Sequence, residues 1–376
     1  MKILIFENSI GFSSYTSKLC ESFGNYPNLQ IDYLTIPNNE YLINTKPNIN
    51  VIPSLSSFNN SKKKTLSWLF DRIRVALHNI KIRNRYCKKT KYDVISIQET
   101  IPIFDRFFIK KFCKNNPNVV YTVHDVIPPI KSSFWSIKSL KKIYTCCHKL
   151  IVHTDGNKKQ LVDKFNISPD KIYVINHGTD EEYTRLNQTE CKTTIGLDKN
   201  KICVLFYGMI REQKGLDILI EALKGSENIQ LFIAGALPHG DAFDQYDASI
   251  RNNNIDVFKM IRFIPEDMTD IVYNSCDFVC LPYKYFYSQS GVFMQAIKYR
   301  KPIVASDVSS FRDYFDRYNI GFLCKPNNIV DLSTKIKEMV NILNSNPNYF
   351  YHDLDRAARE NSWDVSAEKY LSVFKK

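Results

Sequence analysis

The sequence predicts an α/β fold with two domains, each built on a doubly wound parallel sheet. Short apolar segments typical of buried strands alternate with segments of helical periodicity along the whole chain. The chain of 376 residues also exceeds the usual size of one hydrophobic core. Charge divides it further: residues 1–190 hold 28 Lys and Arg against 16 Asp and Glu, whereas residues 191–376 hold 23 of each. This asymmetry supports a domain boundary near residue 190.

The apolar segments place the elements of each domain in order. The first domain is expected over residues 1–185, with strands near 2–6, 30–34, 94–97, 119–123, 150–152 and 172–175 and helices between them. The second is expected over 190–355, with strands near 202–207, 230–234, 261–264, 278–281 and 302–306. Residues 356–376 are expected to form a closing helix, with Ser362 as its cap.

Composition excludes several classes of protein. No segment approaches eighteen uninterrupted apolar residues, so no membrane-spanning helix is expected. The apolar segment at the amino terminus is interrupted by polar residues too early to form the core of a signal peptide. The ten cysteines form no C-x-x-C pair and no cluster with zinc-ligand spacing. We therefore expect buried, reduced thiols and no metal site. The expected location is the cytoplasm, with peripheral attachment to the inner face of the plasma membrane as a further hypothesis.

One segment carries much of the positive charge. Residues 62–91 contain eleven Lys or Arg and one acid, Asp71. The basic residues include Arg83, Arg85, Lys88 and Lys89, and an apolar stripe at helical spacing comprises Leu66, Leu69, Phe70, Ile73, Leu77 and Ile80. Three interpretations are open: a surface helix with its stripe packed on the sheet, an interfacial helix on anionic lipid, and a nucleic-acid surface. Of these three interpretations, the nucleic-acid surface is the one we do not expect.

Two features of the second domain suit a diphosphate. Arg211 and Lys214 follow a buried strand at its carboxyl end, where open α/β sheets bind ligands. Ser290 and Gly291 open a helix whose first N–H groups form an anion site. Cations facing a helix N-terminus hold a pyrophosphate without a metal. The pattern therefore predicts an enzyme that uses a nucleotide-activated donor.

Longer segments carry a resemblance to a known family. They are YGMIREQKGLDILIEAL (207–223), LFIAGAL (231–237), IRFIPEDMTDIVYNSCDFVCLPY (261–283), QSGVFMQAIKYRKPIVASDV (289–308) and, in the first domain, TVHDVIPP (122–129). The chain resembles a family 4 glycosyltransferase of the GT-B fold, a group of retaining, metal-independent sugar transferases. The resemblance implies two Rossmann-like domains facing a cleft, with the carboxy-terminal helix returning to the first domain. No cofactor is implied beyond the donor substrate, a UDP- or GDP-linked sugar.

The resemblance also assigns roles to residues. It places Arg211 and Lys214 on the donor diphosphate, where preorganised cations stabilise the charge of the leaving group. It places His124, at the end of a core strand, beside the transferred sugar. These three are the expected catalytic residues. The expected donor-binding residues are Gly11, Gly208, Gly235, Tyr287, Gln289, Ser290, Gly291 and Gln295.

One departure concerns the paired glutamates of the family. Tyr287 and Gln295 stand at the two glutamate positions, and the chain resembles a branch with Gln-Ser-Gly-Val (289–292) at this place. Gln295 retains the capacity to hydrogen-bond a ribose, and Ser290 and Gly291 retain the phosphate site. The replacement of the two glutamates leaves the identity of the donor sugar open.

The leading functional hypothesis is a transferase that moves a sugar to a hydroxyl of a glycan, with a lipid-linked acceptor, in surface polysaccharide biosynthesis. One alternative is a non-catalytic GT-B scaffold that still binds nucleotide. The other is a nucleotide-sugar epimerase, which needs acid/base carboxylates where Tyr287 and Gln295 stand.

Overall fold

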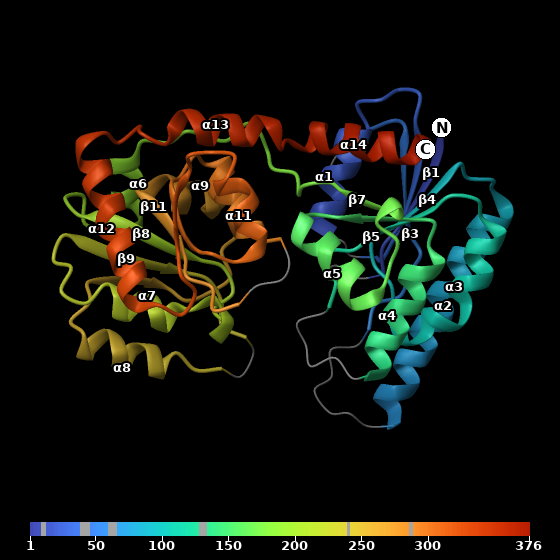
Figure 1. Cartoon of the computed structure of the whole chain (residues 1–376), viewed down its shortest axis with the longest axis horizontal. Helices are drawn as coiled ribbons and strands as arrows, with labels where there is room; N and C mark the ends of the chain where they lie inside the picture. The colour runs from blue at the N-terminus through green and yellow to red at the C-terminus, as the bar shows by residue number, and fades with distance from the viewer. Residues whose placement is uncertain (9–12, 38–45, 59–65, 128–133, 239–240, 286–288) are drawn as a thin grey trace. The chain divides into compact units, whose positions relative to one another are not determined.

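The computed structural model describes residues 1–8, 13–37, 46–58, 66–127, 134–238, 241–285 and 289–376. It divides into two compact units (Figure 1). The first comprises Met1–Gly178 together with Trp363–Lys376, and the second comprises Thr179–Ser362. Each unit contains one parallel sheet with helices on its faces, so the predicted α/β class is confirmed.

The sheet of the first unit is covered on both faces. Its described strands pair in parallel in the order β3-β2-β1-β4-β5-β6-β7. Along β1, Ile3 and Ile5 join one hydrophobic cluster while Leu4 and Phe6 join the other. Unbroken apolar strands are typical of sheets buried on both sides. The strands are β1 (Lys2–Phe6), β2 (Gln30–Thr35), β3 (Ile49–Pro53), β4 (Val94–Ile97), β5 (Val119–Thr122), β6 (Lys149–Val152) and β7 (Ile172–Val174).

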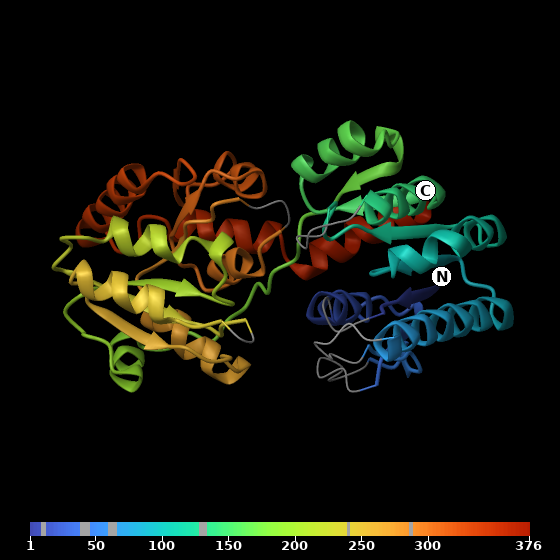
Figure 2. The same cartoon turned by 90° about the horizontal axis from the view of Figure 1, so that it is seen from below.

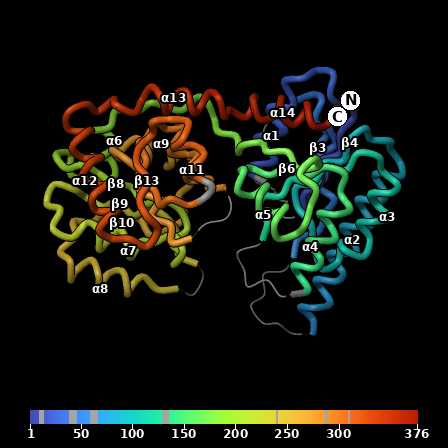
Figure 3. Tube along the Cα trace, viewed as in Figure 1, coloured from blue at the N-terminus to red at the C-terminus, as the bar shows by residue number. Residues whose placement is uncertain are grey.

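The last helix of the chain belongs to the first unit. Helix α14 (Trp363–Lys375) lies beside α1 (Ser13–Phe23), as the red and blue segments show in Figure 3. The phenols of Tyr15 and Tyr370 are 2.9 Å apart in this contact, and Tyr370 is also within 3.0 Å of the Thr122 hydroxyl. The remaining helices are α2 (Leu66–Lys89), α3 (Pro102–Asn115), α4 (Phe134–Cys146) and α5 (Asp155–Phe165).

The second unit repeats the same architecture. Its described strands pair in parallel in the order β10-β9-β8-β11-β12-β13. The strands are β8 (Ile202–Tyr207), β9 (Ile229–Ala234), β10 (Val257–Met260), β11 (Phe278–Leu281), β12 (Ile303–Ser306) and β13 (Gly321–Cys324). The helices are α6 (Gln188–Ile195), α7 (Leu216–Ala222), α8 (Asp244–Asn252), α9 (Glu266–Ser275), α10 (Gly291–Lys298), α11 (Ser309–Phe315), α12 (Ile329–Ser345) and α13 (Tyr351–Glu360).

The strand predicted at 261–264 is wrong. Strand β10 ends at Met260 and, among the described strands, pairs with β9 alone, so it is an edge strand with half-exposed side chains. Lys259 lies within it, paired with Asp247 at 2.6 Å. Because the prediction assumed a fully buried apolar strand, it placed the strand too far along the chain, at a segment in which Phe263 is exposed.

The basic helix α2 buries only part of the stripe that its periodicity predicted, namely Ile80 and, partly, Ile73. Its buried residues are Val75, Ala76, Asn79, Ile80 and Arg83. Of the predicted stripe, Leu66, Leu69, Phe70 and Leu77 are exposed. The interpretation that the whole stripe packs on the sheet is therefore wrong, because the buried residues of the helix begin at Val75.

Arg83, named among the basic residues of this segment, does not lie at the surface with the others. It is fully buried, and its Nη1 donates to the Asp105 carboxylate of α3 at 2.9 Å. Its guanidinium also lies near the rings of Phe6 and Phe112, at 5.2 and 4.3 Å from their centroids. Arg83 is a structural link between α2 and α3, and breaking a buried ion pair is strongly destabilising.

Candidate functional site

The topology of the second sheet indicates where a ligand binds. The strand order reverses between β8 and β11, so the loops after these two strands diverge at a switch point, which is where open α/β sheets bind ligands. The loop after β8 carries Arg211 and Lys214, and the loop after β11 carries Tyr283. Helix α10 follows, beginning at Gly291.

A chain of contacts joins Lys214 to the start of α10. The ammonium of Lys214 donates to the Tyr283 hydroxyl at 2.6 Å and lies 4.1 Å from the centre of its ring. The Tyr283 hydroxyl is 3.0 Å from Ser290 Oγ, which in turn accepts the Phe293 N–H as the cap of α10. The structure thus brings together two groups predicted separately, the cation and the helix N-terminus.

Tyr283 was not predicted as part of the site. It is 1% exposed and reads in sequence as the end of an apolar strand. The signal available in the sequence was its place, two residues beyond β11 at a carboxyl strand end. Its hydroxyl fixes Lys214 and Ser290 relative to each other.

Arg211 is placed differently from Lys214. It is exposed, and its described hydrogen bond runs from Nε to the sulfur of Met209 at 3.1 Å. It lies on the same loop, at the residue before the short 3-10 turn Glu212–Lys214. Its side chain remains at the surface, in reach of solvent rather than in the Tyr283 contacts.

Glycines hold the loops of the site close together. Gly208 and Gly235 have φ of +95° and +155°, and a Cβ on Gly235 would overlap the carbonyl of Gly208. Gly215, with φ of +72°, sits against the carbonyl of Pro282. Only glycine fits at these positions. The structure thus gives the predicted Gly208 and Gly235 a role in loop packing, and it adds Gly215, which links the β8 and β11 loops.

Gln295 lies on α10 above a group of aromatic rings. Its Oε1 accepts a hydrogen bond from the Tyr273 hydroxyl at 3.1 Å. Tyr273 is buried and stacks on Tyr299, with ring centres 4.6 Å apart. Because the carbonyl oxygen of the amide is engaged by Tyr273, the NH₂ group is the part of Gln295 that remains to donate to a ligand.

The other predicted donor-site residues have separate outcomes. Gln289 donates from Nε2 to the Met294 sulfur at 3.3 Å, and its buried Oε1 has no hydrogen-bond partner among the residues described. Gly291 is exposed, with open space where a Cβ would stand. Gly11 and Tyr287 lie outside the described residues.

His124 belongs to the first unit, at the carboxyl edge of its sheet. It follows β5, and it meets His153, which follows β6, at 3.1 Å between Nδ1 of the first and Nε2 of the second. Nδ1 of His153 is 3.0 Å from the carbonyl oxygen of Ile175. The Tyr15 ring packs against both, with centroid distances of 4.8 and 5.1 Å.

Burial keeps these histidines neutral. Desolvation, followed by the neighbouring His153 and His177, holds the pKa of His124 well below its ordinary value. Desolvation also lowers the pKa of His153 to about 3 and that of His177 to about 4. At neutral pH His124 is therefore an uncharged hydrogen-bonding group and not a cation.

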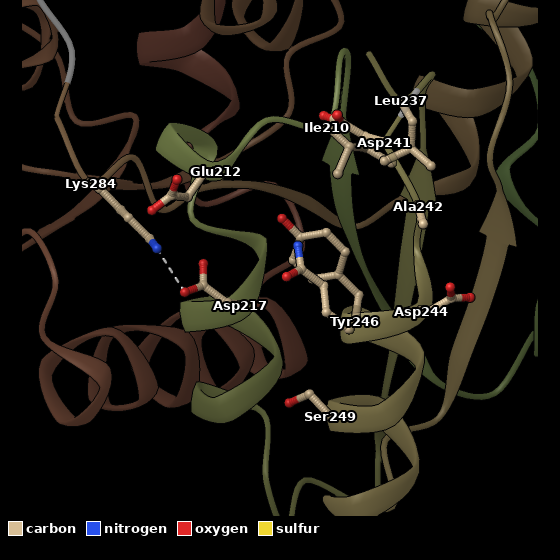
Figure 4. Close-up of a pocket in the computed structure, with 11 residues that line it drawn as sticks. Ile210, Glu212, Asp217, Leu237, Asp241, Ala242, Asp244, Tyr246, Ser249 and Lys284 are labelled. Atoms are coloured by element: carbon tan, nitrogen blue, oxygen red, sulfur yellow. Dashed lines mark ion pairs between the residues drawn. The ribbon is translucent and has the colours of Figure 1, made fainter. Parts of the chain in front are cut away.

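A separate pocket of about 810 Å³ lies beside the loops after β8 and β9, lined by residues of α7 and α8 (Figure 4). Its lining includes Glu212, Asp217, Asp241 and Asp244, and its Lys284 is paired with Asp217 at 2.8 Å. This acidic lining disfavours a diphosphate. The pocket contains neither Lys214 nor Ser290, and we assign it no ligand.

Thiols and carboxylates contribute little to the site. All ten cysteines are free, and most are buried, as predicted. Among the described residues, no group of three or more His, Cys, Asp or Glu is placed to hold a metal ion. Metal independence of the reaction stays a prediction.

Two protein-family models match consecutive parts of the chain. The model described as Glycosyltransferase Family 4 matches residues 53–183, and the model described as Glycosyl transferases group 1 matches residues 187–360. The two matched segments follow each other along the chain and leave out residues 1–52, 184–186 and 361–376. The first match contains His124 and extends to residue 183, just past the end of the first unit at Gly178. The second match lies within the second unit and contains Lys214, Tyr283 and Ser290.

Relatives of known name match parts of the chain. A D-inositol 3-phosphate glycosyltransferase of Mycobacterium sp. (strain JLS) is 30% identical over 166 residues, which are 43% of this chain and 37% of that protein. The enzyme of that name from Mycolicibacterium smegmatis is 26% identical over 231 residues, 60% of this chain and 52% of that protein. The matches therefore span about a third to a half of the length of these relatives.

Three solved structures resemble the whole chain. HepE of Anabaena, in complex with UDP, has a TM-score of 0.77 at 15% identity and covers 100% of this chain and 99% of that one. Sucrose-phosphate synthase of Thermosynechococcus elongatus has a TM-score of 0.74 at 16% identity, covering 100% and 98%. WaaG, a glycosyltransferase involved in lipopolysaccharide biosynthesis, has a TM-score of 0.69 at 13% identity, covering 100% and 99%. These likenesses confirm the predicted GT-B fold.

Proposed function

We propose that the protein is a retaining, metal-independent glycosyltransferase. It moves a sugar from a UDP- or GDP-linked donor to a hydroxyl of a glycan, and the acceptor is lipid-linked, as in surface polysaccharide biosynthesis. The observation that carries this proposal is the hydrogen-bonded connection from Lys214 through Tyr283 to Ser290 at the start of α10. The complex of HepE with UDP supports the donor class.

The site suits the departure of a nucleoside diphosphate. Negative charge grows on the diphosphate as the sugar leaves, and groups already oriented toward that charge stabilise the transition state most. Lys214 supplies a cation held in place by Tyr283, and the first N–H groups of α10 supply the positive end of a helix dipole. Arg211, exposed on the same loop, adds a second cation at the phosphates. Gln295 donates to the ribose from its NH₂ group.

The experiment is a panel of nucleotide sugars assayed for release of the nucleoside diphosphate, with and without a glycan acceptor. We expect one donor to be turned over, and turnover to rise when the acceptor is present. If donors bind and shift the melting temperature but none is turned over with any acceptor, the protein is a nucleotide-binding scaffold and the proposal of catalysis is wrong.

We also propose that the protein docks on anionic membrane through helices α2, α3 and α4 of the first unit. Helix α3 lies between the other two (Figure 2), and Arg83 and Arg106 link it to them. Exposed apolar side chains lie in the first turns of these helices: Leu66, Leu69, Phe70, Ile103, Phe107 and Trp135. Together with the exposed cations of the same helices, we call them the basic-apolar face.

The charge of the basic-apolar face is complementary to anionic lipid. Its exposed cations are Arg74, Lys81, Arg85, Lys88, Lys89, Lys110, Lys111, Lys114, Lys138, Lys141 and Lys142. The three helices contain two acids, of which Asp71 is paired with Arg74 and Asp105 is buried against Arg83. Each basic residue near an anionic bilayer contributes about 1 kcal/mol of attraction. No helix in the described part of the chain is long and apolar enough to span a bilayer.

A further inference from the structure

Another pocket lies at the amino edge of the first sheet. It has a volume of about 590 Å³ and is formed where strands β1, β2 and β3 begin, with residues of the loops before β2 and β3 in its wall. His124 lies at the opposite, carboxyl edge of the same sheet. The five residues of β1 separate the two edges by about 16 Å, at about 3.3 Å for each residue. The pocket is therefore distinct from the candidate site described above.

The charges of this pocket balance. Among the described residues that line it, the charged ones are Lys2 and Asp32, whose ammonium and carboxylate are 3.9 Å apart. The Asp32 carboxylate also accepts from the Tyr92 hydroxyl at 2.6 Å and from the Asn50 amide at 2.8 Å. An anion would meet one cation that already lies beside a carboxylate, and a cation would meet a carboxylate whose two oxygens are engaged. The pocket therefore suits an uncharged ligand.

Amide side chains supply polar groups without charge, and their partners fix the orientation of two of them. Nδ2 of Asn48 donates to the backbone carbonyl of Tyr26 at 3.0 Å, and Nδ2 of Asn50 donates to the Asp32 carboxylate. A carbonyl and an ionised carboxylate only accept hydrogen bonds. The NH₂ end of each amide is therefore the end that faces the protein.

The amide oxygens of Asn48 and Asn50 are then the ends that meet a ligand, and they accept hydrogen bonds. Because hydrogen bonds already hold both amides in the folded protein, a ligand orders them at little entropic cost. Gln30, exposed at the start of β2, adds an amide that can both donate and accept. Pro27 and Pro47 add apolar surface to the lining. Hydroxyls that donate, together with C–H faces that cover apolar surface, are the chemistry of a carbohydrate.

We propose that this pocket binds a segment of a neutral glycan, whose hydroxyls donate to the amide oxygens of Asn48 and Asn50. Its volume lies within the range of small-molecule sites, about 300–1,000 Å³. The binding does not rest on the proposed transfer reaction, since every group named belongs to the amino edge of the first unit.

The test is amide NMR of the full chain, deuterated and ¹⁵N-labelled, titrated with four neutral oligosaccharides: maltotetraose, cellotetraose, chitotetraose and mannotetraose. No nucleotide sugar is added, so no transfer takes place. We expect at least one oligosaccharide to shift the signals of residues 24–32 and 46–50 in a saturable way. Asn48→Ala and Asn50→Ala should each weaken that binding by about 5-fold, the scale of one lost hydrogen bond between neutral groups.

Asn341→Ala is the matched control. It removes the amide of another exposed asparagine, on α12 of the second unit, and should leave the affinity at the native value. Folding of each variant is checked by its melting temperature. Native affinity in both folded variants, Asn48→Ala and Asn50→Ala, would overturn the proposal.

The position of the shifts decides between this pocket and the carboxyl edge. Oligosaccharides that shift only carboxyl-edge residues such as Asn8 and Val123, or a panel in which none of the four shifts any signal, would show that the amino edge holds no glycan site. A protein that turns over no donor but shows the saturable shifts at residues 24–32 and 46–50 would contradict the proposed transfer reaction and support the glycan site.

Discussion

The Lys214 ammonium donates a 2.6 Å hydrogen bond to the Tyr283 hydroxyl, and this contact joins the β8 loop to the β11 loop at the switch point of the second sheet. A lysine side chain has several rotatable bonds, and its orientation costs entropy. The hydrogen bond to Tyr283 already orients the Lys214 ammonium in the folded protein, before any ligand binds. The first prediction concerns this pair.

Lys214→Ala should lower kcat/KM by about 100-fold or more, the scale of a lost transition-state contact. Tyr283→Phe should lower it by about 10-fold, because a hydrogen bond that involves a charged group contributes about 1.5 kcal/mol or more, while the cation itself remains. Steady-state kinetics with the accepted donor measures both. Lys224→Ala, an exposed lysine at the end of α7, is the control and should match the native protein. Equal losses in Lys214→Ala and Lys224→Ala would remove Lys214 from the site.

The second prediction concerns the ribose. Gln295→Leu should raise the donor KM by about 5- to 10-fold with little change in kcat, because a uniform binding contact of about 1 kcal/mol is lost. Gln295→Glu should retain most of the affinity, since a carboxylate accepts from both Tyr273 and a ribose hydroxyl. A donor KM that is the same in Gln295→Leu and native protein would show that α10 does not contact the ribose.

The third prediction is a dependence of stability on pH. Histidines titrate near 6.5 in an unfolded chain, whereas in the folded protein the pKa of His153 is about 3 and that of His177 about 4. Below about pH 6.5 the unfolded state binds more protons, so the free energy of unfolding should fall as pH falls, by about 1.4 kcal/mol per pH unit for each such histidine.

Tryptophan fluorescence during denaturant unfolding measures this effect in the first unit, since Trp68, Trp135 and Trp363 all lie there. Between pH 6 and 5, the free energy of unfolding should fall less steeply in His153→Gln than in native protein. The difference should be about 1.4 kcal/mol per pH unit, which is the contribution of one histidine. A native protein whose stability is constant from pH 7 to 5 would contradict the neutral, buried histidines.

The fourth prediction concerns the basic-apolar face. The protein should bind vesicles that contain anionic lipid, leave neutral ones in solution, and release as salt shortens the Debye length from about 10 Å at 0.1 M to about 3 Å at 1 M. Charge reversal at Lys110, Lys111, Lys138 and Lys142 should abolish binding, and Phe107→Ser should weaken it.

Matched controls separate the face from net charge. Reversal of four exposed lysines of the second unit, Lys199, Lys224, Lys325 and Lys337, changes the net charge equally and should leave binding intact. Val330→Ser, at a residue 77% exposed, is the control for Phe107→Ser. If both charge-reversed proteins lose vesicle binding equally, the binding depends on net charge in general and not on the basic-apolar face.

The sequence predicted the central strands well and the edges poorly. Strands such as β8 and β11 are apolar throughout because both their faces are covered, and such a pattern is visible in one sequence. The edge strands β3, β10 and β13 are only half-buried, so their patterns are mixed: β3 and β13 were missed and β10 was displaced, whereas the edge strand β7 was predicted. Helix α2 shows the same limit, since periodicity finds a stripe but does not tell which part of it meets a neighbour.

The candidate site divides in a similar way. Lys214 and Ser290 were predicted because their types and places fit a diphosphate, and Gln295 because the family resemblance places it at the ribose. Tyr283, Tyr273 and His153 were not, because each acts through another side chain and its partner is distant in the fold or hidden in an apolar pattern. Contacts of that kind appear only when the loops are placed in space.

The most direct test of the central claim is calorimetric titration of UDP and GDP into the native protein in the presence of EDTA. We expect one of the two nucleotides to bind without a divalent metal and to bind Lys214→Ala about 10- to 100-fold more weakly, the scale of one hydrogen bond to a charged group. Lys224→Ala should bind as the native protein does. Binding that appears only when Mg²⁺ or Mn²⁺ is restored, or that is unchanged in Lys214→Ala, would contradict the donor site proposed at Lys214, Tyr283 and Ser290.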